Sequence, residues 1–322
     1  MGGRARKLVL DSGGKMNRAA ARRELGTLQE LVVSQRTSER YTKAVCTFLQ
    51  FNKEEGDHLP RTFAGLDKAL MRWIEYLWES GDSKGIATNG IAGCQHVVPG
   101  CRGRLPGAWR LLSAWGRHEL PARAPPLTLA MVRALAGECL RQRQPGAASV
   151  LMLGFRCFLR PGEMLKVTPA DITVDLKNKT AVINLGMTKS GIRGGVAESV
   201  ICRCGETVNM LAAVCSRRKA HQPLFEGSSA AFRGLFARAL HQLNLDEFEF
   251  KMYSLRRGGA TAVFEIEGNM QSLTVEGRWA NERTARIYIN SGLAALATMR
   301  LSAPAKTAIA KATSYLEKIL SG

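Results

Sequence analysis

Residues 171–203 read DITVDLKNKTAVINLGMTKSGIRGGVAESVICR, and they interrupt a chain that is otherwise patterned as helices. The stretch contains three short runs rich in β-branched residues, which are DITVD, TAVINL and ESVICR. Turn-rich LKNK separates the first two runs, and the basic loop GMTKSGIRGGVA separates the last two. Runs of this length between turn signals are typical of strands joined as hairpins. The stretch therefore predicts a small three-stranded antiparallel sheet.

Helices are predicted before this sheet. From residue 27 to about residue 120, apolar residues recur at helical spacing, as in GLDKALMRWIEYLWESG at 65–81. We expect a bundle of four or five helices here, with Thr37 as the N-cap of the first long helix. Tryptophan side chains in such a bundle more often pack in the core than contact a ligand. The core is therefore expected to hold Trp73, Trp78, Trp109 and Trp115.

Helical patterning resumes after the Pro-rich connector LPARAPPLT at 120–128, which is the best domain boundary in the chain. Helices are expected at roughly 128–142, 147–159, 207–219, 229–243, 254–266, 269–277, 281–290 and 303–320. The predicted fold class is mainly α with a small antiparallel β-sheet. The predicted parts are a basic, flexible arm at 1–26, a helical bundle at 27–120, a linker at 121–127, an α+β domain at 128–302 and a terminal helix at 303–322.

The charge balance indicates a polyanionic partner. The chain has 322 residues, with 46 Lys and Arg against 27 Asp and Glu, and a formal net charge of +19. A surplus of this size repels itself in the folded state, so nucleic acid is the expected partner. The sequence has no apolar run of about 18 residues that could span a bilayer, and MGGRARKLVL lacks the apolar region of a secretory signal. We therefore expect an intracellular protein that binds no membrane.

The eight cysteines fit the same compartment. Most lie in apolar runs such as AVCTFL and GFRCFL, as reduced core cysteines do in intracellular proteins. The pair in CRC at 202–204, with Cys215 and His221 beyond it, has a spacing that matches no common zinc pattern. No metal site is expected.

Several polar residues occur at positions where the pattern of a buried core predicts apolar residues. Arg160 ends an apolar helix in CFLRPGEML, and Glu163 begins the next helix. Taken singly, each such residue also fits an ordinary role, such as a solvated helix junction, an exposed loop lysine or a half-buried tyrosine. In chain order the candidates are Arg160, Glu163, Lys189 in MTKSG, Tyr253 and Arg256 in YSLRRGG, Trp279, and Tyr288 nine residues after Trp279.

Together these residue types can handle a phosphodiester. Paired guanidiniums hold the non-bridging oxygens and stabilise the extra negative charge of a pentacoordinate phosphorus. An indole N–H adds one more donor. A tyrosine hydroxyl can attack phosphorus and divide one displacement into two steps. A protonated lysine can give its proton to the leaving oxygen.

The order and local context of these residues resemble the tyrosine recombinase (phage integrase) family. That family shows Arg-x-x-Glu at a helix start, a lysine in a β-hairpin, a His/Lys-x-x-Arg box followed by small residues, then His or Trp, and a nucleophilic Tyr nine residues later. The resemblance covers residues 125–300 as a catalytic domain, and the preceding bundle resembles the family's core-binding domain. The YSLRRGG box is also similar to recombinases of eukaryotic retrotransposons.

The departure from the family pattern is at Tyr253, where the box most often has His and sometimes Lys. None of the five histidines lies near the box, so a small shift of alignment recovers none. A tyrosine hydroxyl is a much weaker base than imidazole at neutral pH, but it can donate to a phosphate oxygen. We therefore expect Tyr253 to bind or position the phosphate. The adjacent Arg257 is expected to flank the site.

The resemblance implies a site-specific DNA recombinase or integrase. It implies that Tyr288 attacks a phosphate of double-stranded DNA and forms a 3′-phosphotyrosine, without metal, ATP or another cofactor. Arg160, Arg256 and Trp279 would hold the phosphoryl group, Lys189 would protonate the leaving 5′-oxygen, and the glutamate of Arg-x-x-Glu would orient its neighbours. Family members act as tetramers on DNA and often pass a C-terminal helix to a neighbour. TAIAKATSYLEKIL at 307–320 is a candidate for that helix, and packing within its own chain is the equal alternative.

Three other functions remain open from the sequence. A type IB topoisomerase or a telomere resolvase shares the same chemistry. A DNA-binding descendant that has lost catalysis is suggested by the tyrosine in the box. A nonspecific RNA-binding helical protein is supported by the charge alone.

Overall fold

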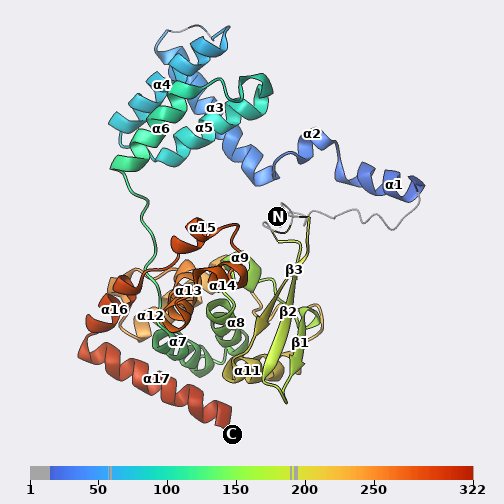
Figure 1. The fold of residues 1–322 in the computed structure, drawn as a ribbon, viewed down its shortest axis with the longest axis vertical. Coiled ribbons are helices and arrows are strands. Elements are labelled where there is room, and N and C mark those ends of the chain that lie inside the picture. Colours follow the sequence, from blue (N-terminus) through green and yellow to red (C-terminus); the bar gives the residue numbers. More distant parts are fainter. Residues whose placement is uncertain (1–14, 57, 59, 189–190, 192–194, 322) are drawn as a thin grey trace. The chain divides into compact units, whose positions relative to one another are not determined.

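The computed structural model describes the chain except residues 1–14, 57, 59, 189–190, 192–194 and 322 (Figure 1). The chain divides into two compact units, Met1–Ala122 and Arg123–Gly322. Among the described residues, helices predominate and one three-stranded antiparallel sheet accompanies them. The predicted fold class is therefore confirmed. Of the helices described, none is long and apolar enough to cross a membrane.

The first unit is helical throughout its described secondary structure. Its core is formed by large side chains that are at most 2% exposed, including Phe48, Leu70, Trp73 and Ile91. The segment predicted as a flexible arm includes helix α1, and residues 1–14 of that arm lie outside the described residues. The α-helices are α1 Lys15–Leu25, α2 Leu28–Leu31, α3 Gln35–Glu54, α4 Phe63–Glu79, α5 Lys84–Val97 and α6 Pro106–His118.

Helix α3 begins before the predicted N-cap. Ser34 has an extended backbone, and its hydroxyl oxygen accepts the backbone N–H of Thr37 at 3.3 Å. Ser34 is therefore the N-cap, and the prediction of Thr37 in that role is wrong. Both residues are good caps, and only the backbone conformation distinguishes them.

The tryptophans of the first unit divide into two pairs. Trp73 and Trp115 are 1% and 4% exposed and belong to the core, as predicted. Trp78 and Trp109 are 44% and 40% exposed, so the prediction of a core position is wrong for these two. Trp78 still contacts the edge of Trp115, with ring centroids 5.3 Å apart, so its ring covers the core from outside.

The second unit contains the sheet, whose strand order is β1-β2-β3. Ile183 of β2 lies opposite Ile172 of β1 on one side and Val200 of β3 on the other, and both pairings are antiparallel. The sheet predicted from residues 171–203 is therefore confirmed. Its three strands are β1 Ile172–Asp175, β2 Thr180–Gly186 and β3 Glu198–Cys202, and Figure 1 shows them beside helix α11, Gly205–Cys215.

Helices α7 and α8 form the centre of the second unit together with α13. Two glycines allow α13 to approach its neighbours closely. A Cβ on Gly258 would lie 1.9 Å from the carbonyl oxygen of Leu127, and one on Gly259 would lie 2.0 Å from that of Phe155. This close packing of α13 places Arg256, on the same helix, in the interior of the unit. The bounds are α7 Leu129–Arg141, α8 Pro145–Arg156, α9 Pro161–Met164, α12 Ser229–Gln242, α13 Tyr253–Glu267 and α14 Met270–Glu276.

The chain after α14 differs from the prediction of one helix over 281–290. Helix α15 covers Glu282–Arg286, and α16, which the sequence did not predict, covers Ser291–Met299. Between α15 and α16, backbone groups form hydrogen bonds with side chains of α13 and do not continue the helix. Arg257 donates to the carbonyl oxygen of Ile287 at 2.9 Å, and the N–H of Asn290 donates to the hydroxyl of Thr261 at 3.1 Å. Tyr288 therefore lies in the turn between α15 and α16 and not in a helix.

The last helix, α17 Ala303–Ser321, packs along α7 of its own chain, below it in Figure 1. Ala305, Ala312 and Leu316 are buried at this contact. The approach is close, because a Cβ on Gly137 of α7 would lie 2.0 Å from the carbonyl oxygen of Ala312. Packing within the chain, one of the two alternatives for this helix, is what the structure contains.

Candidate active site

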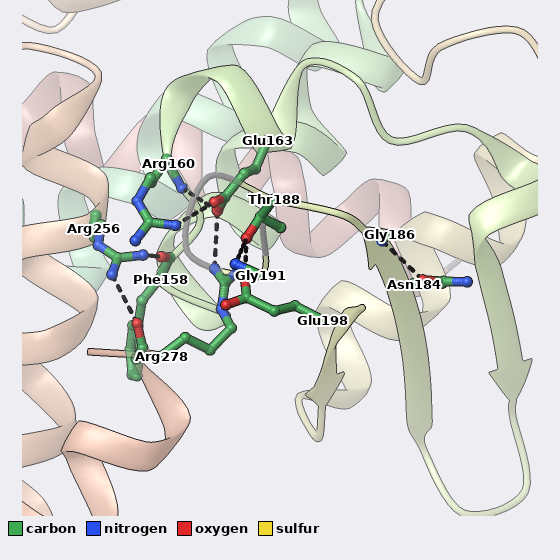
Figure 2. Close-up of polar contacts among 11 residues, drawn as sticks. Phe158, Arg160, Glu163, Asn184, Gly186, Thr188, Gly191, Glu198, Arg256 and Arg278 are labelled. Carbon is green, nitrogen blue, oxygen red and sulfur yellow. Dashed lines mark hydrogen bonds and ion pairs between the residues drawn. The ribbon is translucent and has the colours of Figure 1, made fainter. Parts of the chain in front are cut away.

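Arg256 lies at the centre of a small cluster in the second unit. Its guanidinium donates through Nη1 to the carbonyl oxygen of Phe158, which follows α8. Nη2 donates at 2.7 Å to the carbonyl oxygen of Gly277, which follows α14. Figure 2 shows the guanidinium beside Phe158 and facing Arg160. One side chain from α13 therefore joins two other segments of the unit.

Two aromatic rings cover the Arg256 guanidinium. Its Cζ lies 4.6 Å from the ring centroid of Trp279 and 5.2 Å from that of Tyr288. The two rings contact each other with centroids 4.9 Å apart. We call Phe158, Arg256, Trp279 and Tyr288 the arginine–aromatic cluster. Its rings lie where cation–π attraction stabilises a buried guanidinium.

The Arg256 side chain is wholly enclosed, with 0% of its surface exposed. Burial disfavours the charged form, and the positive charge of Arg160 adds to this effect, so the pKa of Arg256 is lowered to about 10. The side chain is still protonated at neutral pH. Among the described residues no carboxylate forms an ion pair with it, and its charge is held by backbone oxygens and aromatic faces.

Arg160 and Glu163 form the second part of the site. Arg160 stands at the N-cap of α9, where its backbone N–H donates to Oε2 of Glu163 at 2.9 Å. Its Nη1 donates to Oε1 of the same carboxylate at 2.5 Å. Burial of Glu163 raises its pKa, but the Arg160 N–H and the nearby guanidiniums outweigh burial and lower it overall. Glu163 is thus an ionised residue that orients Arg160.

Arg278 joins this pair to the sheet. Its Nη2 donates to Oε2 of Glu163 at 2.9 Å, and its Nη1 donates to Oε2 of Glu198 at 2.8 Å. The hydroxyl of Thr188 also donates to Oε2 of Glu198, at 2.5 Å. We call these five residues the carboxylate network: Arg160, Glu163, Thr188, Glu198 and Arg278. Figure 2 shows the network running from the start of α9 to the end of β2.

The sequence did not predict Arg278 or Glu198. Glu198 had a readable signal, because it alternates in β3 with the buried Val200 and Cys202 and so faces inward with them. An inward carboxylate requires a cationic partner. The sequence around Arg278 contains no comparable signal, since its partners lie 80 and 115 residues earlier in the chain.

The backbone at Tyr288 is fixed by side chains of α13. Arg257 holds the carbonyl oxygen of Ile287 at 2.9 Å, and Arg123 approaches the same oxygen at 3.5 Å. The hydroxyl of Thr261 lies 3.5 Å from the carbonyl oxygen of Tyr288 itself. Arg257, expected to flank the site, therefore positions the segment that carries Tyr288.

The remaining predicted residues lie in different surroundings. Trp279 is 8% exposed, and its indole N–H is buried with no hydrogen-bond partner in the described part of the chain. Tyr253 is the first residue of α13 and is 45% exposed. Lys189 lies outside the described residues. The structure thus brings together Arg160, Glu163, Arg256, Trp279 and Tyr288, and the roles of all seven predicted residues stay predictions.

Metal ligands are not grouped in the described residues. No three or more His, Cys, Asp or Glu side chains there converge to hold a metal ion. Five of the eight cysteines are buried as free thiols: Cys94, Cys101, Cys139, Cys157 and Cys202.

Solved structures share this fold. The Tn1549 transposon integrase in complex with transposon right end DNA matches with a TM-score of 0.57 and 15% identity, over 87% of this chain and 96% of that chain. The same integrase with circular intermediate DNA matches with a TM-score of 0.53 and 17% identity, over 82% and 98%. The XerH site-specific recombinase, bound to a palindromic difH substrate in a post-cleavage complex, matches with a TM-score of 0.53 and 14% identity, over 85% and 79%.

No protein-family model matches the chain, and no curated protein matches it by sequence. The structural likeness spans most of each chain. The chain therefore has the fold of the tyrosine recombinases and integrases, and the resemblance predicted from the sequence is confirmed at the level of the fold.

Proposed function

We propose that this protein is a tyrosine recombinase, a DNA strand-transferase that cuts and rejoins double-stranded DNA through a 3′-phosphotyrosine on Tyr288. The fold supports this proposal, because the similar integrase and recombinase structures are complexes with DNA. The net charge of +19 suits a partner with many phosphates.

The observation that carries the proposal is the enclosed Arg256 guanidinium. Burying a cation without a carboxylate partner is unfavourable unless something else compensates for the lost hydration. Here two carbonyl oxygens and the rings of Trp279 and Tyr288 compensate in part. An anion that binds next to the Arg256 guanidinium would complete the compensation of its buried charge. A phosphodiester next to Arg256 would also lie next to the only tyrosine hydroxyl in the cluster.

The roles of the other residues follow from this arrangement. Arg160 and Arg256 clamp the non-bridging oxygens, and the indole N–H of Trp279, which bonds to none of the described residues, supplies a further donor. The Tyr288 hydroxyl gives its proton to solvent water, its oxygen bonds to phosphorus, and the bond from phosphorus to the 5′-oxygen breaks. Lys189 protonates that leaving oxygen, and a 5′-hydroxyl from a partner site later reverses these steps. The bond energy is conserved in the phosphotyrosine, so the reaction consumes no ATP.

The enclosure of Arg256 adds one requirement. Because its guanidinium has no exposed surface, a phosphate reaches it only after the Tyr288 ring moves aside. The turn between α15 and α16, which carries Tyr288, is the segment that would make this movement. DNA binding and the movement of the nucleophile are therefore coupled in our proposal.

The assembly and the compartment are part of the same proposal. Strand exchange between two duplex sites cuts four DNA strands, and each cut needs one Tyr288. We therefore propose a homo-tetramer on DNA. The protein would act inside the cell wherever its DNA is. Relaxation of supercoils without strand exchange would instead identify a type IB topoisomerase.

A catalytically inactive DNA-binding descendant is the second candidate function. It is favoured by one observation, which is that Tyr253 occupies the position of the family's usual histidine and is 45% exposed. This candidate predicts sequence-dependent DNA binding with no covalent adduct on any DNA.

The test is covalent capture on nicked suicide duplexes drawn from a randomised pool. Wild type should yield a protein–DNA adduct on a denaturing gel, and tryptic mapping should locate it on the peptide IYINSGLAALATMR, residues 287–300. Tyr288→Phe should yield none. Tyr315→Phe, on α17 and outside the arginine–aromatic cluster, is the matched control and should yield the wild-type amount. An adduct that persists in Tyr288→Phe would show that another residue is the nucleophile.

A further inference from the structure

Arg278 joins the two carboxylates of the carboxylate network, Glu163 and Glu198, by one ion pair to each. It contacts Glu163 at 2.9 Å and Glu198 at 2.8 Å, and its own side chain is only 9% exposed. The two carboxylates come from separate segments, since Glu163 lies in α9 and Glu198 begins β3. One guanidinium therefore fixes the distance between the start of α9 and the sheet.

We propose that Arg278 is a positioning residue for phosphoryl transfer, which holds Arg160 and the end of β2 in one arrangement through Glu163 and Glu198. This inference rests on the proposed function. Arg278 itself touches no reacting group, because both arms of its guanidinium are directed at carboxylates.

The first step concerns Arg160. Oε2 of Glu163 is shared between the Arg160 N–H and Arg278, which leaves Oε1 for the Arg160 guanidinium. Without Arg278, both oxygens of Glu163 can turn to the Arg160 guanidinium in a bidentate pair. Such a pair would hold Arg160 more firmly on the carboxylate and weaken its attraction for a phosphodiester. Arg278 thus keeps Arg160 oriented and available.

The second step concerns charge. Glu198 is partly buried, with its side chain 16% exposed, and Arg278 forms an ion pair with it at 2.8 Å. Loss of Arg278 would leave the negative charge of this carboxylate less compensated beside the site. A phosphodiester is also an anion, so the repulsion between them would oppose its binding in the transition state.

The third step concerns the end of β2. Glu198 accepts from the hydroxyl of Thr188 at 2.5 Å, and that hydroxyl oxygen accepts the N–H of Gly191 at 3.1 Å. Thr188 and Gly191 are the described residues on either side of the segment that contains Lys189. Arg278 is therefore linked through Glu198 to Thr188 and Gly191, the described residues on either side of Lys189.

The backbone of Arg278 supports a role for its side chain. Its φ is 55°, in the left-handed region that favours glycine. An arginine in this conformation is strained, and its two ion pairs compensate for the strain. The same geometry makes Arg278→Gly a suitable variant, since glycine removes the guanidinium and relieves the backbone.

The matched control is Arg133. This residue of α7 also bridges two carboxylates, Glu206 at 3.0 Å and Glu317 at 2.9 Å, but it ties α7 to α11 and α17 and lies outside the carboxylate network. Arg133→Ala therefore removes a double ion pair without touching the site. Any effect that arises from general loss of ion pairs appears in both variants.

The activity experiment measures single-turnover adduct formation on the suicide duplex captured by wild type. Arg278→Gly should form the adduct about 100-fold more slowly, as expected for a misplaced catalytic group, with its Kd for DNA unchanged within about threefold. Arg278→Lys, and added guanidinium ion with Arg278→Gly, should each restore part of the rate. Arg133→Ala should react at the wild-type rate.

A second measurement follows positioning without activity. Amide hydrogen exchange reports the N–H groups of Arg160 and Gly191, which bond to Glu163 and Thr188. Both amides should exchange faster in Arg278→Gly and at the wild-type rate in Arg133→Ala. Unchanged exchange at both amides would overturn the positioning claim, whatever the rate of adduct formation.

The two measurements separate this inference from the proposed function. Faster exchange with a wild-type adduct rate would show that the network is structural, and it would overturn the role in phosphoryl transfer. If wild type forms no adduct on any duplex, the proposed function fails first and this role falls with it. Slower adduct formation together with faster exchange supports the proposal.

Discussion

The Tyr288 side chain has two separable contributions, one from its ring and one from its hydroxyl. The ring contacts Trp279 with centroids 4.9 Å apart and the Arg256 guanidinium at 5.2 Å, and it packs against the small apolar cluster around Phe158. The hydroxyl is the group that we propose to attack phosphorus. Tyr288→Phe removes the hydroxyl alone, whereas Tyr288→Ala removes both.

The structure gives the expected size of each effect on stability. The aromatic pair with Trp279 contributes about 0.5–1.5 kcal/mol beyond burial, and the cation–π contact with Arg256 contributes about 0.5–2 kcal/mol. With the lost apolar packing, Tyr288→Ala should lower the free energy of unfolding by about 3 kcal/mol. For a unit of this size that corresponds to a fall in Tm of roughly 6–12 °C. Tyr288→Phe keeps the ring, so its change should stay within about 1 kcal/mol.

Thermal denaturation of both variants without DNA, combined with the adduct gel, checks this reasoning. Tyr288→Phe should keep the wild-type Tm and form no adduct. Tyr288→Ala should have a lowered Tm and also form no adduct. A wild-type Tm for Tyr288→Ala would refute the claim that the ring closes the arginine–aromatic cluster. A large loss of stability in Tyr288→Phe would show that the hydroxyl has a structural bond, and the missing adduct could then not be assigned to chemistry.

Three further predictions follow from the same region. Glu163→Gln removes a carboxyl whose pKa lies below its usual 4.5, so its loss of stability should be full above about pH 4.5 and shrink as the pH falls through the lowered pKa. Urea denaturation at about pH 7 and about pH 3 checks this, and a constant difference would contradict it. Gly258→Ala and Gly259→Ala bring a Cβ within 2.0 Å of a carbonyl oxygen and should each destabilise by about 1–3 kcal/mol, whereas Gly162→Ala meets open space and should change little, as Tm values will show. Tyr253→His should keep or raise the adduct yield on the gel, and a collapse would reveal a specific function of that hydroxyl.

Much of the fold was readable from local pattern. The three strands at 171–203 and most helices follow from apolar residues that recur with periods of two and 3.6 residues, and these periods are visible in the sequence. The errors lie where local signals compete. Ser34 and Thr37 are both good N-caps, and the backbone conformation of Ser34 selected it. Trp78 and Trp109 follow the helical pattern, but the packing of neighbouring helices leaves them at the rim of the core.

The candidate site was partly readable. Arg160 and Arg256 stood out because charged residues interrupt apolar runs, and the two are indeed close enough for the charge of Arg160 to lower the pKa of Arg256. The turn that carries Tyr288 was not readable, because side chains of α13 replace the bonds that would have continued α15.

The amino-acid pattern by itself specified the elements, their order and the residue types able to bind a phosphate, because these depend on spacing along the chain. The folded structure alone selected the partners of the buried charges. Arg278 meets Glu163 and Glu198 across 115 and 80 residues, and Arg256 meets carbonyl groups 98 residues before it and 21 residues after it. Burial makes an unpaired charge unfavourable wherever it lies, but which group satisfies it depends on how distant segments pack.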